Sequence, residues 1–213
     1  MNEDIFRTYD IRGIVDRDFN PELIIDLGKA FGTILKENNY HTMSISGDVR
    51  HTTGILKKNF IKGALSVGVD ICDMGSLPTP VNYFSLFNTD IPHSVQITGS
   101  HNPAEYNGFK LSYNKKPFYG DSIQKLKNII KDSSYFKSDD YGTLFERMDV
   151  LDDYFDKELI AELSNNFIFN TEDNTDLDFK KYHEIVHIAR TEVRNALNNK
   201  TPITTWYNYL LSI

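Results

Sequence analysis

A serine hydroxyl lies beside basic side chains in the segment Thr98–Lys110, whose residue types are the best suited to chemistry in this chain. Gly99 allows the backbone to bend sharply next to Ser100, and Pro103 restricts φ just beyond it. His101 and the lysine that ends the segment can supply positive charge nearby. A serine presented on a rigid turn suits covalent group transfer. The alternative interpretation is a polar turn that its serine and asparagine side chains cap.

The elements that must position this segment follow from hydrophobic periodicity and turn residues. Helices are predicted over residues 20–35, 52–65, 78–87 and 121–131, and strands over residues 42–46, 69–73, 94–98 and 109–113. This alternation predicts an α/β layered sheet. The Ser100 turn follows one of these strands, and α/β sheets place ligand sites at such strand ends.

The chain changes character after Gly142. All 12 glycines lie at or before this position, and the tight turns of an α/β domain favour glycine. We therefore predict an α/β domain over residues 1–150, followed by a tail of helices and polar linkers over residues 151–213. Helices are expected over residues 151–163 and 176–198, with apolar faces that pack on the first domain or on another chain.

Length, composition and charge limit the classes of function. The chain has 213 residues, of which 40% are hydrophobic and 25% charged, as is ordinary for a globular protein. Its formal net charge of −7 argues against a nucleic-acid partner. No uncharged apolar run is long enough to span a membrane, and the acidic start of the chain does not resemble a signal peptide. With one cysteine, Cys72, the sequence is typical of a cytoplasmic protein.

Four segments resemble, in order and spacing, those of the α-D-phosphohexomutases, the phosphoglucomutase/phosphomannomutase family. Ile5–Gly13 resembles the family's opening segment, and Gly47–Arg50 resembles its second loop, in which the family usually has Gly-Arg-Asp-x-Arg. Asp73–Pro80 resembles the Gly-x-x-x-Thr-Pro segment, and Thr98–Lys110 resembles the phosphoserine loop. The resemblance covers about residues 4–160. It implies the family's first domain, a layered mixed α/β sheet with flanking helices.

The resemblance also implies chemistry for particular residues. Ser100 would carry a phosphoryl group, donate it to a hexose phosphate, and take the other phosphate back from the bound hexose 1,6-bisphosphate. Arg12 and Lys110 match residues that flank the reacting oxygen, with roles in charge stabilisation and proton transfer, and His101 neighbours the phosphoserine. Phosphoryl transfer needs alignment and positive charge on the equatorial oxygens. The family also implies Mg²⁺, of which the phosphorylated Ser100 would be one ligand.

Tyr9 and Asn102 match positions that the resemblance assigns to substrate binding. Three loops of the family do not occur in these residues: the Asp-x-Asp-x-Asp-Arg magnesium loop, the Gly-Glu-x-Ser-Gly sugar loop, and an Arg- and Ser-rich phosphate loop. We therefore expect a truncated form that interconverts hexose 1-phosphate and 6-phosphate only where a complementing chain or a homo-oligomer supplies the missing groups. The alternative is a noncatalytic module that binds phosphosugars or a partner.

The segment His183–His187 reads His-Glu-Ile-Val-His and fits the zinc-protease pattern H-E-x-x-H. Two histidines at i and i+4 share one face of a helix. Arg190 and Arg194 fall on the same flank, where their charge opposes a dication, and no histidine or acidic residue follows Glu192. An apolar stripe explains this helix without a metal. We therefore interpret the pattern as a chance match and not as a zinc hydrolase.

Overall fold

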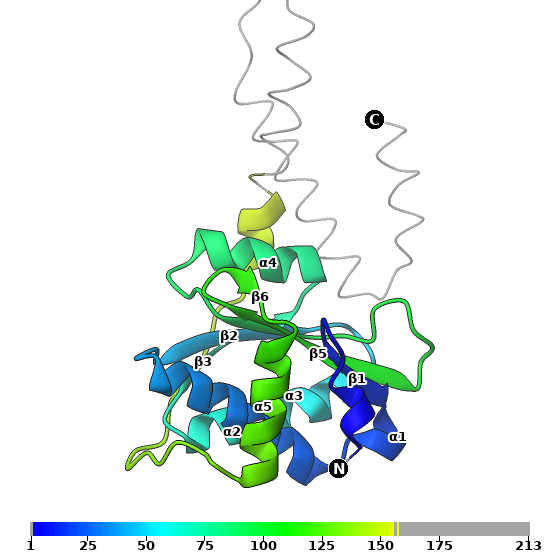
Figure 1. The fold of residues 1–213 in the computed structure, drawn as a ribbon. Coiled ribbons are helices and arrows are strands. Elements are labelled where there is room, and N and C mark those ends of the chain that lie inside the picture. The colour runs from blue at the N-terminus through cyan, green and yellow to red at the C-terminus, as the bar shows by residue number, and fades with distance from the viewer. Residues whose placement is uncertain (1, 156, 158–213) are drawn as a thin grey trace, which may run out of the picture. The chain divides into compact units, whose positions relative to one another are not determined.

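The computed structural model describes residues 2–155 and 157. The chain divides after Leu151, and the compact unit before this point holds the whole sheet (Figure 1). Most of the predicted tail, including the helix over residues 176–198 and the His183–His187 segment, lies outside the described residues. No helix in the described part of the chain is long and apolar enough to cross a membrane.

Helices and strands alternate along the chain much as the sequence predicts. In chain order they are η1 (Glu3–Ile5), β1 (Ile11–Ile14), α1 (Val15–Asp18), α2 (Pro21–Glu37), β2 (Thr42–Gly47), α3 (Thr53–Ser66), β3 (Asp70–Ser76), α4 (Thr79–Asn88), β4 (Ser94–Ile97), β5 (Tyr106–Tyr113), β6 (Lys116–Pro117), α5 (Asp121–Asp132) and β7 (Leu144–Glu146). Each predicted helix and strand between residues 20 and 131 is present, with small differences at its ends. Hydrophobic periodicity and turn residues do not predict η1, β1, α1, β6 or β7.

The strands form one mixed seven-stranded sheet in the order β1-β5-β4-β2-β3-β7, with β6 paired to β5. β2 is parallel to β3 and β4, and β3 is parallel to β7. β5 is antiparallel to β1, β4 and β6. The expected layered mixed α/β sheet is therefore confirmed. The loop after β4 leaves from the carboxyl edge of the parallel strands, where α/β sheets place ligands.

Helices α2, α3 and α5 cover one face of the sheet, and α4 covers the other (Figure 1). α2 begins at Pro21 because the side chain of Asn20 accepts a hydrogen bond from the N–H of Leu23. A proline fits the first turn because the N–H that it lacks would have no partner within the helix. α2 packs so closely on α3 that a Cβ at Gly63 would lie 1.9 Å from the carbonyl oxygen of Ile25. A glycine at this position therefore permits the contact between the two helices.

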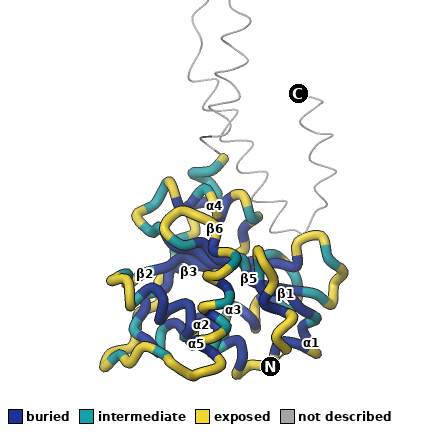
Figure 2. Tube along the Cα trace, in the orientation of Figure 1, coloured by how far each residue is buried: buried dark blue, intermediate teal, exposed yellow. Residues whose placement is uncertain are grey.

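The apolar core lies between the sheet and helices α2, α3 and α5. Alternate strand residues face it, such as Val95 and Ile97 of β4 and Phe109 and Leu111 of β5. Phe60 of α3 stacks on Phe109 with ring centroids 5.6 Å apart. Figure 2 shows the buried residues concentrated in the sheet and in the helix faces that meet it. The other residues of β4, and those of β2 beside it, face α4.

The α4 face of the sheet is polar where the helix meets it. Asn82 of α4 donates from Nδ2 to the Ser46 hydroxyl, and its Oδ1 accepts the Ser94 hydroxyl, both at 2.7 Å. Ser46 donates to Oε1 of Gln96, whose Nε2 donates to the Leu77 carbonyl at 2.8 Å. These side chains are buried, so their mutual hydrogen bonds offset the cost of removing polar atoms from water.

Candidate functional site

The loop that joins β4 to β5 presents Ser100 at the carboxyl edge of the sheet. Ser100 has φ +54°, in the left-handed region that residues with a side chain seldom adopt. Its backbone N–H donates to the Thr98 hydroxyl at 2.9 Å, and its hydroxyl oxygen lies 3.3 Å from Nδ1 of His101. Ser100 and His101 are both exposed. The expected turn is therefore present, and it holds the serine hydroxyl open to solvent.

Asn102 closes this turn onto Gly99. Its backbone N–H and its side-chain Nδ2 both donate to the Gly99 carbonyl, at 3.0 and 2.9 Å. The N–H of Tyr106 donates to the Pro103 carbonyl at 3.0 Å, where the chain returns to β5. The amide nitrogen of Asn102, a residue that the sequence analysis assigns to substrate binding, is thus engaged inside the loop.

Arg50 lies across the loop and contacts it along most of its length. Its Nη1 donates to the carbonyls of Pro103 and Tyr106 at 2.6 and 3.0 Å. Its Nη2 donates to the carbonyls of Ser100 and Asn102 at 3.1 and 2.6 Å. Arg50 belongs to the segment between β2 and α3, 50 residues before Ser100. One guanidinium therefore draws together backbone groups from both ends of the loop.

Asp48, in the same segment, joins Arg50 to the loop. Its Oδ2 accepts the backbone N–H of Gly99 at 3.1 Å and lies 3.3 Å from Nε of Arg50. Its Oδ1 accepts the backbone N–H of Arg50 at 3.0 Å and also the Thr53 hydroxyl. Both carboxylate oxygens are thus engaged, and their negative charge offsets the charge of the guanidinium.

Asn107 connects the far end of the loop to the start of α3. Its Nδ2 donates to the hydroxyls of Thr52 and Thr53 at 2.9 and 3.0 Å, and its Oδ1 accepts the N–H of Gly108. Asn107 is fully buried. Because the Thr53 hydroxyl also donates to Asp48, one continuous chain of hydrogen bonds runs from β5 to the serine loop.

Arg12 and Lys110 converge on the carboxylate of Asp10, and we call these three residues the cation cluster. Nη2 of Arg12 donates to Oδ2 of Asp10, and Nζ of Lys110 lies 3.5 Å from the same oxygen. Arg12 is 6% exposed, and its Nε has no hydrogen-bond partner among the described residues. Two cations and one carboxylate give the cluster a net positive charge.

The cation cluster lies on the α4 face of the sheet. Lys110 pairs with Gln96 across β5 and β4, and Arg12 pairs with Gly108 across β1 and β5, so their side chains share that face. Burial raises the pKa of Tyr83 on α4, and the negative charge of the cluster's carboxylate raises it further. The cluster therefore faces the same side as α4, and not the apolar core.

The sheet register places the cation cluster and the serine loop at a similar position along the strand direction. The Thr98 N–H donates to the Gly108 carbonyl at 3.0 Å, and Gly108 pairs with Arg12 on the next strand. Thr98 and Arg12 are thus two strand spacings, about 10 Å, apart across the sheet. The two cations turn to their shared carboxylate, whereas the Ser100 hydroxyl faces His101. The structure therefore holds two neighbouring groups of polar side chains.

Tyr9 is 73% exposed and stacks on Tyr119, with ring centroids 6.1 Å apart and ring planes inclined by 27°. Beside this pair the N–H of Gly120 donates to the Thr8 carbonyl at 2.7 Å, which joins the segments before β1 and α5. The two tyrosines form an exposed aromatic surface, and Tyr9 immediately precedes Asp10 of the cation cluster in the sequence. No sequence motif pointed to Tyr119.

Comparison with known proteins decides the family. The family model described as "Phosphoglucomutase/phosphomannomutase, alpha/beta/alpha domain I" matches residues 3–136. The chain belongs to the phosphoglucomutase/phosphomannomutase family. Ser100 and the cation cluster both lie within the matched region, so the expected family membership is confirmed for the part of the chain that holds the candidate site.

The matches to individual members of the family show what share of each protein this chain covers. A phosphoglucomutase of Neisseria gonorrhoeae is 31% identical over 147 residues, which are 69% of this chain and 32% of that protein. A phosphomannomutase of Klebsiella pneumoniae is 32% identical over 155 residues, 71% of this chain and 96% of that protein. A crystal structure of a phosphoglucomutase/phosphomannomutase family protein from Burkholderia thailandensis is 30% identical, with a TM-score of 0.69, and the match covers 74% of this chain and 35% of that one. This chain therefore spans about a third of the Neisseria and Burkholderia proteins.

The described residues of this family member around Ser100 do not by themselves fit a magnesium ion. Mg²⁺ prefers two or more anionic oxygens in a near-octahedral array. Ser100 offers at most one ligand, and both oxygens of Asp48 already accept hydrogen bonds from the protein. Within residues 2–155 and 157, no three His, Cys, Asp or Glu side chains lie together as a metal site.

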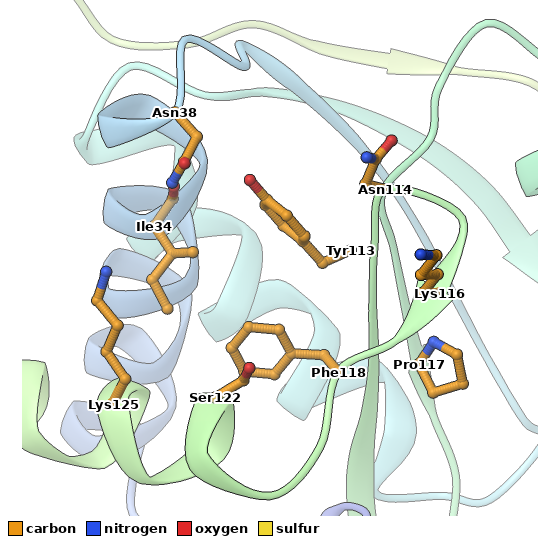
Figure 3. A pocket seen from close by; sticks show the side chains of 9 residues that line it. All are labelled: Ile34, Asn38, Tyr113, Asn114, Lys116, Pro117, Phe118, Ser122 and Lys125. Atoms are coloured by element: carbon orange, nitrogen blue, oxygen red, sulfur yellow. The ribbon is translucent and has the colours of Figure 1, made fainter.

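A separate cavity of about 450 Å³ lies at the other end of β5, between α2, α5 and the β5–β6 hairpin (Figure 3). The rings of Tyr113 and Phe118 point into it beside Ile34, and Lys116 and Lys125 lie on opposite sides of it. Its lining contains neither a carboxylate nor a histidine. This cavity therefore shares no lining residue with the serine loop or the cation cluster.

Sequence reasoning missed the residues that shape the serine loop. Asp48 and Arg50 were noted only as part of a family motif. Their Gly-Asp-x-Arg spacing is the signal that could have identified them. Asn107 carries no such signal, because its partners Thr52 and Thr53 lie 55 and 54 residues away. These residues support the serine loop, which the family resemblance located but did not explain.

Proposed function

We propose that this chain is the phosphoserine-bearing domain of a phosphohexomutase, in which Ser100 carries a phosphoryl group between the 1- and 6-positions of a hexose. The observation that carries the proposal is the preformed loop, in which a left-handed serine is held by Arg50. Membership of the family supports it. A nucleophile that is fixed before the substrate arrives loses little entropy on reaching the reacting geometry.

The half-reaction proposed for the chain itself begins with a hexose 1,6-bisphosphate. Oγ of Ser100 attacks the phosphorus of one phosphate, the bond between phosphorus and the sugar oxygen breaks, and a hexose monophosphate leaves. The proton of the serine hydroxyl passes to the departing sugar oxygen, and Nδ1 of His101, 3.3 Å from Oγ, is placed to relay it. The reverse step, on the sugar's other hydroxyl, completes the interconversion.

The cation cluster supplies positive charge in this proposal. The transferring group spreads negative charge over its equatorial oxygens, which nearby cations stabilise. Arg12 is permanently charged and can fork onto a phosphate, and Lys110 adds a second charge. Because both cations contact Asp10, the substrate phosphate must compete with that carboxylate for them. The exposed ring of Tyr9, just before the cluster in the sequence, is proposed to contact the sugar.

Full turnover is proposed to need groups that these 213 residues lack. The sequence contains no magnesium, sugar or distal phosphate loop of the family type. A complementing chain that carries those loops is the proposed source, or else a homo-oligomer in which other residues of a second copy complete the site. The proposed compartment is the cytoplasm, where the single cysteine, Cys72, remains a free and buried thiol.

A noncatalytic phosphosugar-binding module is the second candidate. One observation favours it: Arg12 and Lys110 contact Asp10, whereas Ser100 contacts His101. In this case a hexose phosphate would bind at the cation cluster, and Ser100 would stay unmodified.

Mass spectrometry after incubation of the purified chain with glucose 1,6-bisphosphate distinguishes the two. We expect one added phosphoryl group on Ser100, none in Ser100→Ala, and no mutase turnover on glucose 1-phosphate or mannose 1-phosphate. Binding of glucose 1-phosphate without any phosphorylation would support the noncatalytic module instead. Turnover of about 1 s⁻¹ or more that disappears in Ser100→Ala would show that the chain or its oligomer completes the site.

A further inference from the structure

We propose that Arg50 is a positioning residue that holds the Ser100 loop ready to accept a phosphoryl group, and that Arg50 does not bind that group. The inference rests on the proposed function, because it takes Ser100 as the carrier. A simple expectation points the other way. Guanidinium and phosphate form paired, charge-assisted hydrogen bonds, so an arginine beside a phosphorylated serine is readily assigned to the phosphate.

The donors of Arg50 are already in use. A guanidinium has five N–H groups and no acceptor. Four of them are donated to carbonyl oxygens of the loop, at distances of 2.6 to 3.1 Å. The fifth, on Nε, faces the Asp48 carboxylate at 3.3 Å. A phosphate that bound Arg50 would have to displace loop carbonyls, and it would thereby break the turn that presents the serine.

Local charge also directs a phosphate away from Arg50. The carboxylate of Asp48 lies against the guanidinium, and both side chains are mostly buried, at 20% and 23% exposure. The positive charge of Arg50 is therefore offset where it lies. Arg12 and Lys110 share a single carboxylate between them, so their cluster keeps the net positive charge that a phosphoryl group needs.

Gly99 provides the surface on which the guanidinium lies. A Cβ at this position would be 2.3 Å from Cζ of Arg50 and 2.5 Å from its Nε. Gly99 is not among the glycines with positive φ, so the close approach of Arg50, and not the backbone conformation, requires a glycine here. Gly99→Ala and Arg50→Ala should therefore disturb the same contact by different routes.

The loop needs this support because of the conformation at Ser100. A residue with a side chain is disfavoured in the left-handed region. Nη2 of Arg50 donates to the carbonyls of Ser100 and Asn102, which lie on either side of His101 in the chain. These two bonds fix the peptide groups that follow Ser100 and Asn102, and with them the direction of the serine side chain.

Arg50→Lys separates positioning of the loop from supply of positive charge, because it keeps the charge but cannot donate to four carbonyls at once. Arg50→Lys and Arg50→Ala are compared with Arg17→Lys, a matched control at an exposed arginine that pairs with Asp18. The readouts are the rate of Ser100 phosphorylation by glucose 1,6-bisphosphate and the hydrogen exchange of the amides in residues 99–106. We expect both Arg50 variants to lose about 100-fold in rate and to exchange faster in the loop, with the control unchanged.

Rescue of the phosphorylation rate by Arg50→Lys would overturn the proposal, because charge alone would then suffice. Loop exchange in Arg50→Ala that matches the wild type would overturn it as well. If the wild-type chain accepts no phosphoryl group, the proposed function fails. The exchange measurement then still decides whether Arg50 holds the loop.

Gly99→Ala gives a second test without a change of charge. We expect the same slow phosphorylation and fast loop exchange as in Arg50→Ala, and no further loss in the double variant, because both substitutions remove one shared contact. Losses that add in the double variant would contradict the proposal. Thermal melting above the assay temperature checks that each variant is folded.

Discussion

Oδ2 of Asp10 lies 3.5 Å from the ammonium of Lys110, and the same oxygen accepts a hydrogen bond from the guanidinium of Arg12. The side chains of Arg12 and Asp10 are only 7% and 12% exposed, so both charges are largely removed from water. Removing one partner of such a pair leaves the other buried without compensation. Asp10 therefore contributes to stability as well as to the placement of the two cations.

Asp10→Asn should lower the free energy of unfolding by about 3 kcal/mol, because it leaves Arg12 buried without its counter-charge. Asp26→Asn is the matched control. The pair of Asp26 with Lys29 is about one-third exposed on both sides, and its loss should cost less than about 1 kcal/mol. Urea denaturation measures both values. Equal losses in the two variants would contradict the role of the buried pair.

Ser100→Ala and Ser100→Gly both remove the hydroxyl but differ in their effect on the backbone. Because Ser100 has φ +54°, a glycine there avoids the clash between Cβ and the carbonyl. We expect Ser100→Gly to be more stable than Ser100→Ala by about 1 kcal/mol, with phosphorylation absent in both. Thermal denaturation compares the two. A less stable glycine variant would show that the serine is not left-handed in solution.

His93 couples stability to pH. It is fully buried, and burial lowers its pKa from 6.5 to about 4. The backbone N–H of Asn114 donates to its Nδ1 at 3.1 Å, so the neutral ring carries its proton on Nε2. Between pH 6.5 and about pH 4 the unfolded chain binds a proton that the folded chain excludes. Stability therefore falls as the pH is lowered through this range.

We expect this group to remove up to about 3 kcal/mol from the free energy of unfolding over that range. His93→Asn should abolish this part of the pH dependence, whereas His41→Asn, at an exposed histidine, should retain it. Urea unfolding at a series of pH values measures the slope. A wild-type slope in His93→Asn would assign the pH dependence to other groups.

Gly63→Ala should destabilise the domain by about 2–3 kcal/mol, because the new Cβ would lie 1.9 Å from the Ile25 carbonyl and would push α2 away from α3. Gly54→Ala, on the same helix, meets nothing within 4 Å and should stabilise by about 0.5 kcal/mol. Guanidinium denaturation gives both values. If Gly54→Ala were as damaging as Gly63→Ala, the close helix contact would not be the cause.

The long elements could be predicted from the sequence because each carries its own signal. Asn20 caps α2, and apolar residues at helical spacing continue it toward Glu37. β1 and β7 lack such a signal, because Arg12 and Gly13 interrupt the first and all three residues of the second are exposed. Both become strands by pairing with β5 and β3, whose residues are distant in the sequence.

In the candidate site, the turn at Ser100 follows from its glycine and proline neighbours, but the residues that hold it do not. Arg50 binds backbone carbonyls, and every residue type has one, so no side-chain pattern marks its partners. The cation cluster depends in the same way on the register of β1 against β5. Contacts that form only when distant segments pair cannot be predicted from the periodicity or spacing of residues in the sequence.

The hydrogen bonds from Asn82 to Ser46 and Ser94 limit how α4 can move. Apolar side chains can slide past one another with little loss of contact, but a hydrogen bond is lost when its atoms shift by about an ångström. These bonds therefore favour one position of α4 along its axis over β2 and β4. Adjustment to a ligand on this face is therefore expected from side-chain rotation and from the serine loop before it is expected from the helix.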